Sequence, residues 1–184
     1  MEALSRGLTG KNENDQMVNY RDQLYAFGLY SKGERYDPVV NGWSTLDLPI
    51  TRSTKVTAVR GEIYAIEVKT STKSATIKKY DVERCSWQTV LSSHEGCRKE
   101  SCVVAAGNHL YVCGGRLEDD FVTKAERFDT VRNKWEEIAN MQQARGCAFD
   151  VATGEMIFVA GGRENPESCL KTCEMFNISL NEWQ

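Results

Sequence analysis

Two apolar runs in the second half of the chain alternate aliphatic and aromatic residues and end in two glycines. These runs are LYVCGG, residues 110–115, and IFVAGG, residues 157–162. A half-apolar stretch precedes each of them, SCVVAA or CAFDVA, and a glycine lies between the stretch and the run. Two alternating, β-rich segments on either side of a glycine turn are typical of an antiparallel hairpin.

A polar loop and two further strand-like segments follow each of these hairpins. The loops are RLEDDFVT and RENPESCL, and the segments after them are AERFD and CEMFN. A short turn, TVRN or ISLN, then leads to a segment that contains a tryptophan, as in WEEI. Each unit therefore predicts four short strands.

The aromatic residues show that this unit is repeated along the chain. The four tryptophans are separated by 44, 48 and 48 residues: Trp43, Trp87, Trp135 and Trp183. Another aromatic residue stands seven positions before each tryptophan: Tyr36, Tyr80, Phe128 and Phe176. A third lies further upstream in each unit: Tyr25, Tyr64, Tyr111 and Phe158. Repetition at a period of this length indicates a solenoid, a propeller or a similar array.

Arginines and turn glycines follow the same period. Arg52, Arg98 and Arg145 each precede a turn glycine by nine residues: Gly61, Gly107 and Gly154. Four strands per unit of about 45 residues, tiled at constant spacing, describe the blades of a β-propeller.

We therefore predict an all-β chain that forms a partial propeller of four repeats, each a four-stranded antiparallel blade. The repeats span residues 16–48, 49–92, 93–140 and 141–184, after a flexible N-terminal segment, 1–15. The fourth repeat lacks most of its outer strand, because Gln184 is one residue beyond its tryptophan.

The paired glycines have two alternative explanations. A phosphate-binding loop needs a helix directly after the glycines, with its N-terminal amides facing the ligand. No helical pattern follows either pair here. In a propeller, glycines let neighbouring backbones approach where a Cβ would clash, and we predict this structural role for Gly114, Gly115, Gly161 and Gly162.

At these residues the chain resembles the kelch repeat, in which a diglycine strand is followed by a Glu-x-aromatic-Asp strand and a Trp strand. The pattern stands here as Gly114-Gly115, residues 126–129 and Trp135, and again as Gly161-Gly162, residues 174–177 and Trp183. The connecting segments are similar to those of BTB–kelch proteins. This resemblance implies a propeller that recruits a substrate, while an N-terminal BTB domain binds a cullin ubiquitin ligase.

Several positions depart from that pattern. The first repeat has Gly28-Leu29 and the second Glu67-Val68 in place of a diglycine, and Lys78 stands where other repeats have Glu34, Glu126 or Glu174. Kelch-like propellers usually have six blades, and this sequence contains four units and no BTB domain. We therefore expect an open arc that can self-associate through its blade edges, and we expect no cullin binding.

Composition and charge exclude several classes of partner. The net charge of −3 and the pI of about 5.5 do not favour nucleic acid, which requires a basic surface. No run approaches the ~18 apolar residues of a membrane span, and the first residues lack the apolar segment of a secretory signal. A cytoplasmic location is therefore the expectation.

Cysteines and histidines do not form a metal-binding pattern. The seven cysteines are irregularly spaced and contain no CxxC pair, so we interpret them as reduced thiols, with Cys97 and Cys169 as candidates for a reactive one. The two histidines, His94 and His109, are too few for a clustered site. We predict no cofactor, no metal and no catalytic residue.

The predicted structural core consists of the repeated aromatics and glycines: Tyr25, Tyr36, Trp43, Tyr64, Tyr80, Trp87, Tyr111, Gly114, Gly115, Phe128, Trp135, Phe158, Gly161, Gly162, Phe176 and Trp183. The loops after the diglycine strands vary in chemistry, as loops that contact partners on a rigid scaffold do. The candidate partner-binding residues there are Arg116, Glu118, Asp119, Asp120, Phe121, Arg163, Glu164, Asn165 and Glu167. The acidic run 118–120 is either a solvated loop or a contact for a basic partner.

The repeated arginines, Arg52, Arg98 and Arg145, admit two interpretations. They are either structural, bonding loop carbonyls or a neighbouring blade's glutamate, or they form a ring that receives an acidic peptide.

The function that these features favour is a non-catalytic protein-binding module. The resemblance implies the substrate-recognition propeller of a BTB–kelch adaptor for a cullin-RING ubiquitin ligase. Two alternatives stay open: a cytoskeletal kelch protein that binds actin, and a metal-dependent kelch enzyme, for which His94 or His109 would be required.

Overall fold

The computed structural model describes residues 16–28, 33–46, 50–51, 54–69, 74–95 and 98–184. Within these residues the regular structure is entirely β, with no helix, so the predicted fold class is confirmed. The predicted N-terminal segment, 1–15, lies outside the described residues. The chain divides into two compact units, one made of Met1–Glu67 with Thr76–Ser92 and the other of Val68–Ala75 with Ser93–Gln184.

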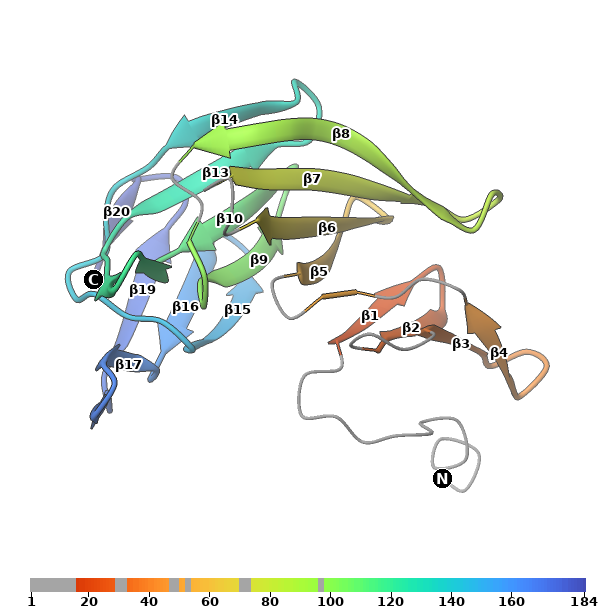
Figure 1. The fold of residues 1–184 in the computed structure, drawn as a ribbon, viewed down its shortest axis with the longest axis horizontal. Helices are drawn as coiled ribbons and strands as arrows, with labels where there is room; N and C mark the ends of the chain where they lie inside the picture. Colours follow the sequence, from red (N-terminus) through yellow and green to blue (C-terminus); the bar gives the residue numbers. More distant parts are fainter. Residues whose placement is uncertain (1–15, 29–32, 47–49, 52–53, 70–73, 96–97) are drawn as a thin grey trace. The chain divides into compact units, whose positions relative to one another are not determined.

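The first unit contains two four-stranded sheets, which we call blades 1 and 2. In each sheet the strands lie in chain order, as Figure 1 shows. Blade 1 consists of β1 (Gln16–Tyr20), β2 (Gln23–Phe27), β3 (Gly33–Asp37) and β4 (Gly42–Leu46). Blade 2 consists of β5 (Thr54–Val59), β6 (Glu62–Lys69), β7 (Ser74–Asp81) and β8 (Ser86–Glu95).

The second unit contains blades 3 and 4 and two short hairpins. Blade 3 consists of β9 (Cys102–Ala106), β10 (His109–Cys113), β13 (Ala125–Asp129) and β14 (Lys134–Glu137). Blade 4 consists of β15 (Phe149–Thr153), β16 (Met156–Ala160), β19 (Cys173–Asn177) and β20 (Glu182–Trp183). The hairpins are β11 (Arg116–Leu117) with β12 (Asp120–Phe121), and β17 (Arg163–Asn165) with β18 (Ser168–Cys169).

Blade 2 is regular in spite of its divergent sequence. Glu67 and Val68, which replace the diglycine, lie inside the eight-residue strand β6. Lys78 binds Glu67 through an ion pair of 2.6 Å. The strand continues here because neither residue demands the unusual backbone that the glycines adopt in blades 3 and 4.

A repeated turn explains the spacing between the aspartate and the tryptophan of each unit. The side chain of the first residue of the turn accepts hydrogen bonds from the backbone N–H groups two or three residues further along. Asp129 Oδ1, for example, accepts from Val131 at 2.8 Å and from Arg132 at 3.0 Å. The fifth residue has a positive φ in every unit, at Asn41, Cys85, Asn133 and Asn181. Asn tolerates this left-handed conformation better than most residues, which accounts for the asparagine two residues before three of the four tryptophans.

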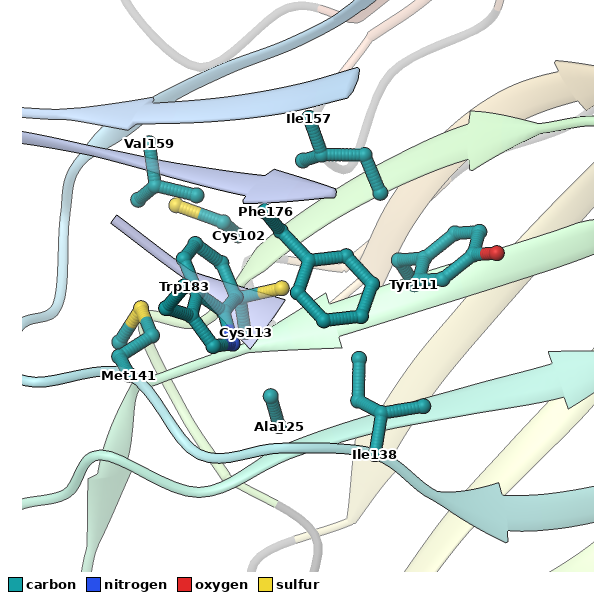
Figure 2. Close-up of a cluster of buried hydrophobic side chains, with 10 residues drawn as sticks. All are labelled: Cys102, Tyr111, Cys113, Ala125, Ile138, Met141, Ile157, Val159, Phe176 and Trp183. Atoms are coloured by element: carbon teal, nitrogen blue, oxygen red, sulfur yellow. The ribbon is translucent and has the colours of Figure 1, made fainter. Parts of the chain in front are cut away.

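The core of the second unit lies between blades 3 and 4 (Figure 2). Blade 3 contributes Cys102, Tyr111, Cys113 and Ala125, and blade 4 contributes Ile157, Val159, Phe176 and Trp183, all buried. The rings of Tyr111 and Phe176 lie 6.1 Å apart between the two sheets. Trp183 also donates its Nε1–H to the carbonyl of Ala139, at 2.7 Å. Neither blade buries both faces alone, so this contact between blades is where the apolar area is removed from water.

Blades 1 and 2 meet through the corresponding positions. Val18, Tyr20, Tyr25 and Phe27 of blade 1 form a buried cluster with Ile63 and Tyr80 of blade 2, and Trp87 packs against it. The rings of Tyr25 and Tyr80 are 6.0 Å apart, and the equivalent rings of Tyr111 and Phe176 are 6.1 Å apart. Gln16 adds a polar link, since its side-chain amide bonds the carbonyl of Thr54 and the amide of Val56.

We name the two sides of such an interface by their residues. We call one side the socket. It is formed by Tyr25 and Phe27 in blade 1, and by Tyr111 and Cys113 in blade 3. We call the other side the wedge. It is formed by Ile63, Tyr80 and Trp87 in blade 2, and by Ile157, Phe176 and Trp183 in blade 4.

The repeated aromatics that we predicted for the structural core differ in how far they are buried. Tyr25, Tyr64, Tyr80, Tyr111, Phe128, Phe176 and Trp183 are buried, but Tyr36, Trp43, Trp87, Trp135 and Phe158 are only half-buried. Tyr36 and Trp43 belong to the wedge of blade 1, and Phe158 to the socket of blade 4. Within the described residues of their own unit, no other blade faces these two sides.

The paired glycines stand where neighbouring backbone comes very close. Gly115 and Gly162 have φ of 100° and 82°, and a Cβ on Gly162 would lie 2.5 Å from the carbonyl oxygen of Gly146. A Cβ on Gly114 would overlap the carbonyl oxygen of Arg145, at the start of the next repeat. Gly114, Gly115 and Gly162 are therefore required by the backbone conformation and by the close approach of other segments. The predicted close approach is absent at Gly161, where an added Cβ would lie 3.6 Å from the carbonyl oxygen of Leu170 and only the φ of 65° favours glycine.

Candidate protein-binding surface

The two polar loops after the diglycine strands each contain a short hairpin, β11–β12 or β17–β18. Arg116 pairs with Phe121 and Leu117 with Asp120 in the β11–β12 hairpin. Arg163 pairs with Cys169 and Asn165 with Ser168 in the β17–β18 hairpin, which contains a bulge. Figure 1 shows β17 beyond the end of blade 4. Each hairpin is therefore a defined projection and not a loose connection.

Main-chain hydrogen bonds hold both hairpins to the segment that leads into their own blade. Arg116 and Lys99 exchange two of these bonds, at 2.7 and 3.1 Å, and Arg163 and Gly146 exchange two at 2.9 Å. The amide of Val122 closes the first hairpin on the carbonyl of Gly115 at 3.0 Å. The bases of the hairpins are thus fixed by backbone atoms, whatever side chains they carry.

Phe121 connects the first hairpin to the next blade. Its ring lies against Gly146, where an added Cβ would be 2.6 Å from Cε1 of the ring. The guanidinium of Arg116 lies 6.0 Å from the centre of the same ring and bonds Asp119 Oδ1 at 3.0 Å. The amide of Cys147 bonds the carbonyl of Glu100 at 2.8 Å. The two hairpins and the segments beside them therefore form one continuous surface across blades 3 and 4.

Exposed acidic side chains dominate this surface. Glu118, Asp119 and Asp120 are exposed on the first hairpin, and Glu164 and Glu167 on the second. Of the basic residues of the two hairpins, Arg163 is exposed, while Arg116 is half-buried and bonded to Asp119. Leu117 and Phe121 add partly exposed apolar area. A surface of this composition suits a basic segment of a protein partner that also carries apolar side chains.

Arg98 lies beneath this surface, not on it. Its side chain is 1% exposed and its Nη1 bonds Glu126 Oε1 at 2.6 Å. The same guanidinium donates to the carbonyl of Gly114 at 2.6 Å and of Val112 at 3.3 Å. A guanidinium enclosed in this way holds the diglycine strand and is not accessible to a peptide carboxylate.

Arg145 has the same role in blade 4. Its Nη2 bonds Glu174 Oε1 at 2.8 Å, and its Nη1 donates to the carbonyls of Gly161 and Thr172 at 3.0 and 3.1 Å. Both arginines bond carbonyls, which is one of the two structural roles we considered, and the glutamate that each of them pairs with belongs to its own blade and not to a neighbouring one. The geometry thus favours the structural interpretation for Arg98 and Arg145. Arg52 lies outside the described residues.

Several residues of the surface were not identified from the sequence. Lys99, Gly146 and Glu100 shape its base, and Gln143 bonds Glu164 Oε2 from below at 2.9 Å. Lys99 and Gly146 directly follow the periodic arginines, so the repeat itself marked their positions. Their contribution is a backbone bond, which side-chain identity does not reveal.

Among the side chains that the structure describes, no group of three His, Cys, Asp or Glu could hold a metal ion. Burial, with Arg127 adding to the effect, lowers the pKa of His109 below its usual 6.5. His94 lies in β8. Cys169 is exposed, and Cys97 lies outside the described residues. No helix in the described part of the chain is long and apolar enough to cross a membrane.

Residues 97–142 and 144–184 match the family model described as "Kelch motif". Kelch-like protein 30 of Homo sapiens is 35% identical over 107 residues, which cover 54% of this chain and 18% of that protein. Kelch-like protein 23 of Mus musculus is 31% identical over 173 residues, which cover 87% of this chain and 31% of that protein. The chain spans less than a third of the length of these relatives.

The solved structure of YjhT has the same fold, with a TM-score of 0.78 at 14% sequence identity. The superposition covers 96% of this chain and 65% of that chain.

Proposed function

Because this chain is a kelch-repeat protein related to the kelch-like proteins, we propose that it is a protein-binding module that recruits its partner through the surface of the two hairpins. One observation supports the proposal most directly. The hairpins present exposed, charged and apolar side chains on a base fixed by main-chain bonds between Arg116 and Lys99 and between Arg163 and Gly146. Binding residues on rigidly supported loops are typical of recognition scaffolds.

The partner that fits this surface is a protein segment with basic and apolar side chains. Asp120, Glu164 and Glu167 offer carboxylates to Lys or Arg, while Leu117 and Phe121 offer apolar contact. Attraction between exposed charges of this kind increases the association rate and is screened by salt. Binding therefore weakens as ionic strength rises.

In a longer protein with a BTB domain, this module would select the substrate of a cullin-RING ubiquitin ligase. The chain by itself would bind the substrate without recruiting the cullin, and would thereby compete with a full-length relative for it. Chemistry at the surface is not required for this role, so the module acts without catalysis.

The test is a quantitative affinity capture from cells, with proteins identified by mass spectrometry. The bait carries either the wild-type sequence or a triple charge reversal, Glu118→Lys, Asp119→Lys and Asp120→Lys. A control, Glu83→Lys with Glu155→Lys, reverses two charges at exposed positions on other turns. A partner kept by wild type and control but lost by the triple variant supports the proposal. Equal capture by all three baits would contradict it.

Two further readouts separate the alternatives. Cosedimentation with actin filaments that survives the triple variant would favour a cytoskeletal protein instead. Recovery of a cullin by this chain alone would contradict the division of roles between the module and a BTB domain.

A further inference from the structure

A cavity of about 300 Å³ lies where blades 1 and 2 meet, at the strand ends that the tight turns connect. All of its lining residues belong to the first unit. The end of β1 and the turn after it contribute Tyr20 and Arg21, and the other lining residues come from β6, β7, β8 and the β7–β8 turn. Small-molecule sites have volumes of roughly 300 Å³ or more. The β11–β12 and β17–β18 hairpins follow the opposite strand ends of blades 3 and 4, so the cavity is separate from the hairpin surface.

Most of the charged groups that line the cavity are bonded within the protein. Lys79 forms an ion pair with Glu62, and this bond raises the pKa of the lysine, so Lys79 is protonated at neutral pH. Asp81 accepts the backbone N–H of Glu83 at 3.1 Å through Oδ1 and the side-chain amide of Gln88 at 2.6 Å through Oδ2. Each of these side chains already has a partner, so together they form a fixed polar wall.

Two lining side chains of opposite charge have their charged groups available for a ligand. The guanidinium of Arg21 lies 5.1 Å from the centre of the Tyr20 ring, and no carboxylate in the described part of the chain pairs with it. The carboxylate of Glu83 likewise has no hydrogen bond or ion pair to any residue that the structure describes. Both residues are exposed. Blade 1 therefore offers a cation at the cavity, and blade 2 offers an anion.

The equivalent positions between blades 3 and 4 carry no charge. Arg21 corresponds to Gly107, because the pairs Tyr20–Gln23 and Ala106–His109 close the same two-residue turn. The other four charged positions, Glu62, Lys79, Asp81 and Glu83, correspond to Met156, Met175, Asn177 and Ser179. Two blades of this chain can therefore pack against each other without these charges, so packing between blades does not explain their presence.

We propose that this cavity binds a small zwitterion, namely a free α-amino acid with an apolar side chain. Arg21 bonds the carboxylate of the ligand, and Glu83 bonds its ammonium group. Tyr20, Tyr80 and Val82 line the cavity as well and contact the apolar side chain. The charged lining residues are two cations and three carboxylates, which sum to −1. A simple anion is therefore less favoured than a ligand that carries both charges.

The test is isothermal titration calorimetry of the 184-residue chain with L-leucine, L-phenylalanine and L-tryptophan. At least one of the three binds saturably. Its analogues without the ammonium group or without the carboxylate, which for L-phenylalanine are hydrocinnamate and phenethylamine, bind about tenfold more weakly, because each loses a charged hydrogen bond.

Substitutions on the protein test the two contacts from the other side. Arg21→Gln and Glu83→Gln each weaken the binding of the amino acid by about tenfold, and circular dichroism confirms that both variants are folded. Asp22→Asn and Arg60→Gln remove exposed charges from the β1–β2 and β5–β6 turns, outside the cavity, and leave binding unchanged.

Three results would overturn the proposal. One is that none of the three amino acids binds saturably. Another is an analogue with a single charged group that binds as tightly as its parent amino acid. The third is a folded Arg21→Gln or Glu83→Gln variant that binds as tightly as wild type. The proposed function is tested separately, since Glu83→Lys with Glu155→Lys loses the amino acid but keeps the protein partner of the hairpins.

Discussion

Lys78 and Glu67 of blade 2 form an ion pair at the positions that Glu126 and Gly114 occupy in blade 3. The pair is 2.6 Å long and half-exposed, with 31% and 18% of the side chains accessible. In blades 3 and 4 the glutamate at this position binds a buried arginine instead. Each of these three blades therefore has an ion pair at its inner strands. In blade 2 the cation, Lys78, lies on the third strand, whereas in blades 3 and 4 the cation is an arginine that precedes the first strand.

Removing the cation of the buried pair, Arg98 with Glu126, should destabilise the protein more than removing the cation of the partly exposed pair, Lys78 with Glu67. We expect Arg98→Met to lower the free energy of unfolding by about 3 kcal/mol, because the carboxylate of Glu126 loses its buried partner and keeps the partly exposed Lys124, 3.3 Å away. Lys78→Met should cost less than Arg98→Met, because Lys78 is 31% accessible and water partly screens its pair with Glu67. Denaturant unfolding of both variants measures the difference, and equal losses would contradict the assignment of Arg98 to the interior.

The two kinds of glycine in blade 4 should respond differently to an added methyl group. Gly154 and Gly162 both have a positive φ, but only Gly162 has backbone within 4 Å of the new Cβ. Gly154→Ala should cost about 1–2 kcal/mol from the left-handed conformation alone. Gly162→Ala should cost roughly 1–3 kcal/mol more, because neighbouring segments must move. Thermal unfolding of the two variants checks this, with Gly154→Ala as the matched control.

The turn of blade 2 can be improved by the residue that the other turns use. Cys85 has a φ of 47°, and Asn41, Asn133 and Asn181 hold this position elsewhere. Cys85→Asn should raise the free energy of unfolding by about 1 kcal/mol or less, because Asn tolerates the left-handed region better. The reverse change, Asn133→Cys, should lower it by a similar amount. Loss of stability in Cys85→Asn would show that the thiol makes a stronger contribution than the backbone.

His109 provides a prediction about pH. Burial lowers its pKa in the folded protein, and Arg127 lowers it further. The neutral form is therefore favoured by folding, so its contribution to stability is fully present above the unfolded pKa of about 6.5. That contribution is lost as the pH falls through the lower folded value.

NMR titration of the imidazole signals measures this pKa directly. Arg127→Gln should raise the pKa of His109 towards 6.5, because one of the causes that lower it is removed. A folded-state value above 6.5 would show that the nearby Asp129, 3.9 Å away, outweighs burial.

The sequence was sufficient to predict the blades because their positions depend on local periodicity. The spacing of Trp135 and Trp183 and the turn glycines predict the four-stranded sheets. The role of Arg98 was harder to predict, because its partner Glu126 is 28 residues away and meets it only through the packing of the blade. The pattern therefore left two interpretations of that arginine open.

The partial exposure of Phe158 could not be predicted for a related reason. At the same repeat position Tyr25 and Tyr111 are buried against an adjacent blade, and a repeat pattern does not state which blades have such a neighbour. The hairpins containing Arg116 and Arg163 were predicted as loops, because their strands are two or three residues long and have no periodicity to detect. Their order comes from pairing with Lys99 and Gly146.

The attachment of each hairpin through peptide groups has a consequence for how such proteins diversify. Since the bonds between Lys99 and Arg116 use N–H and C=O groups that nearly every amino acid carries, substitutions between Gly115 and Val122 leave the attachment intact. Evolution can therefore alter what the tip recognises one residue at a time, and descendants of one gene can acquire unrelated clients while inheriting the same sheets.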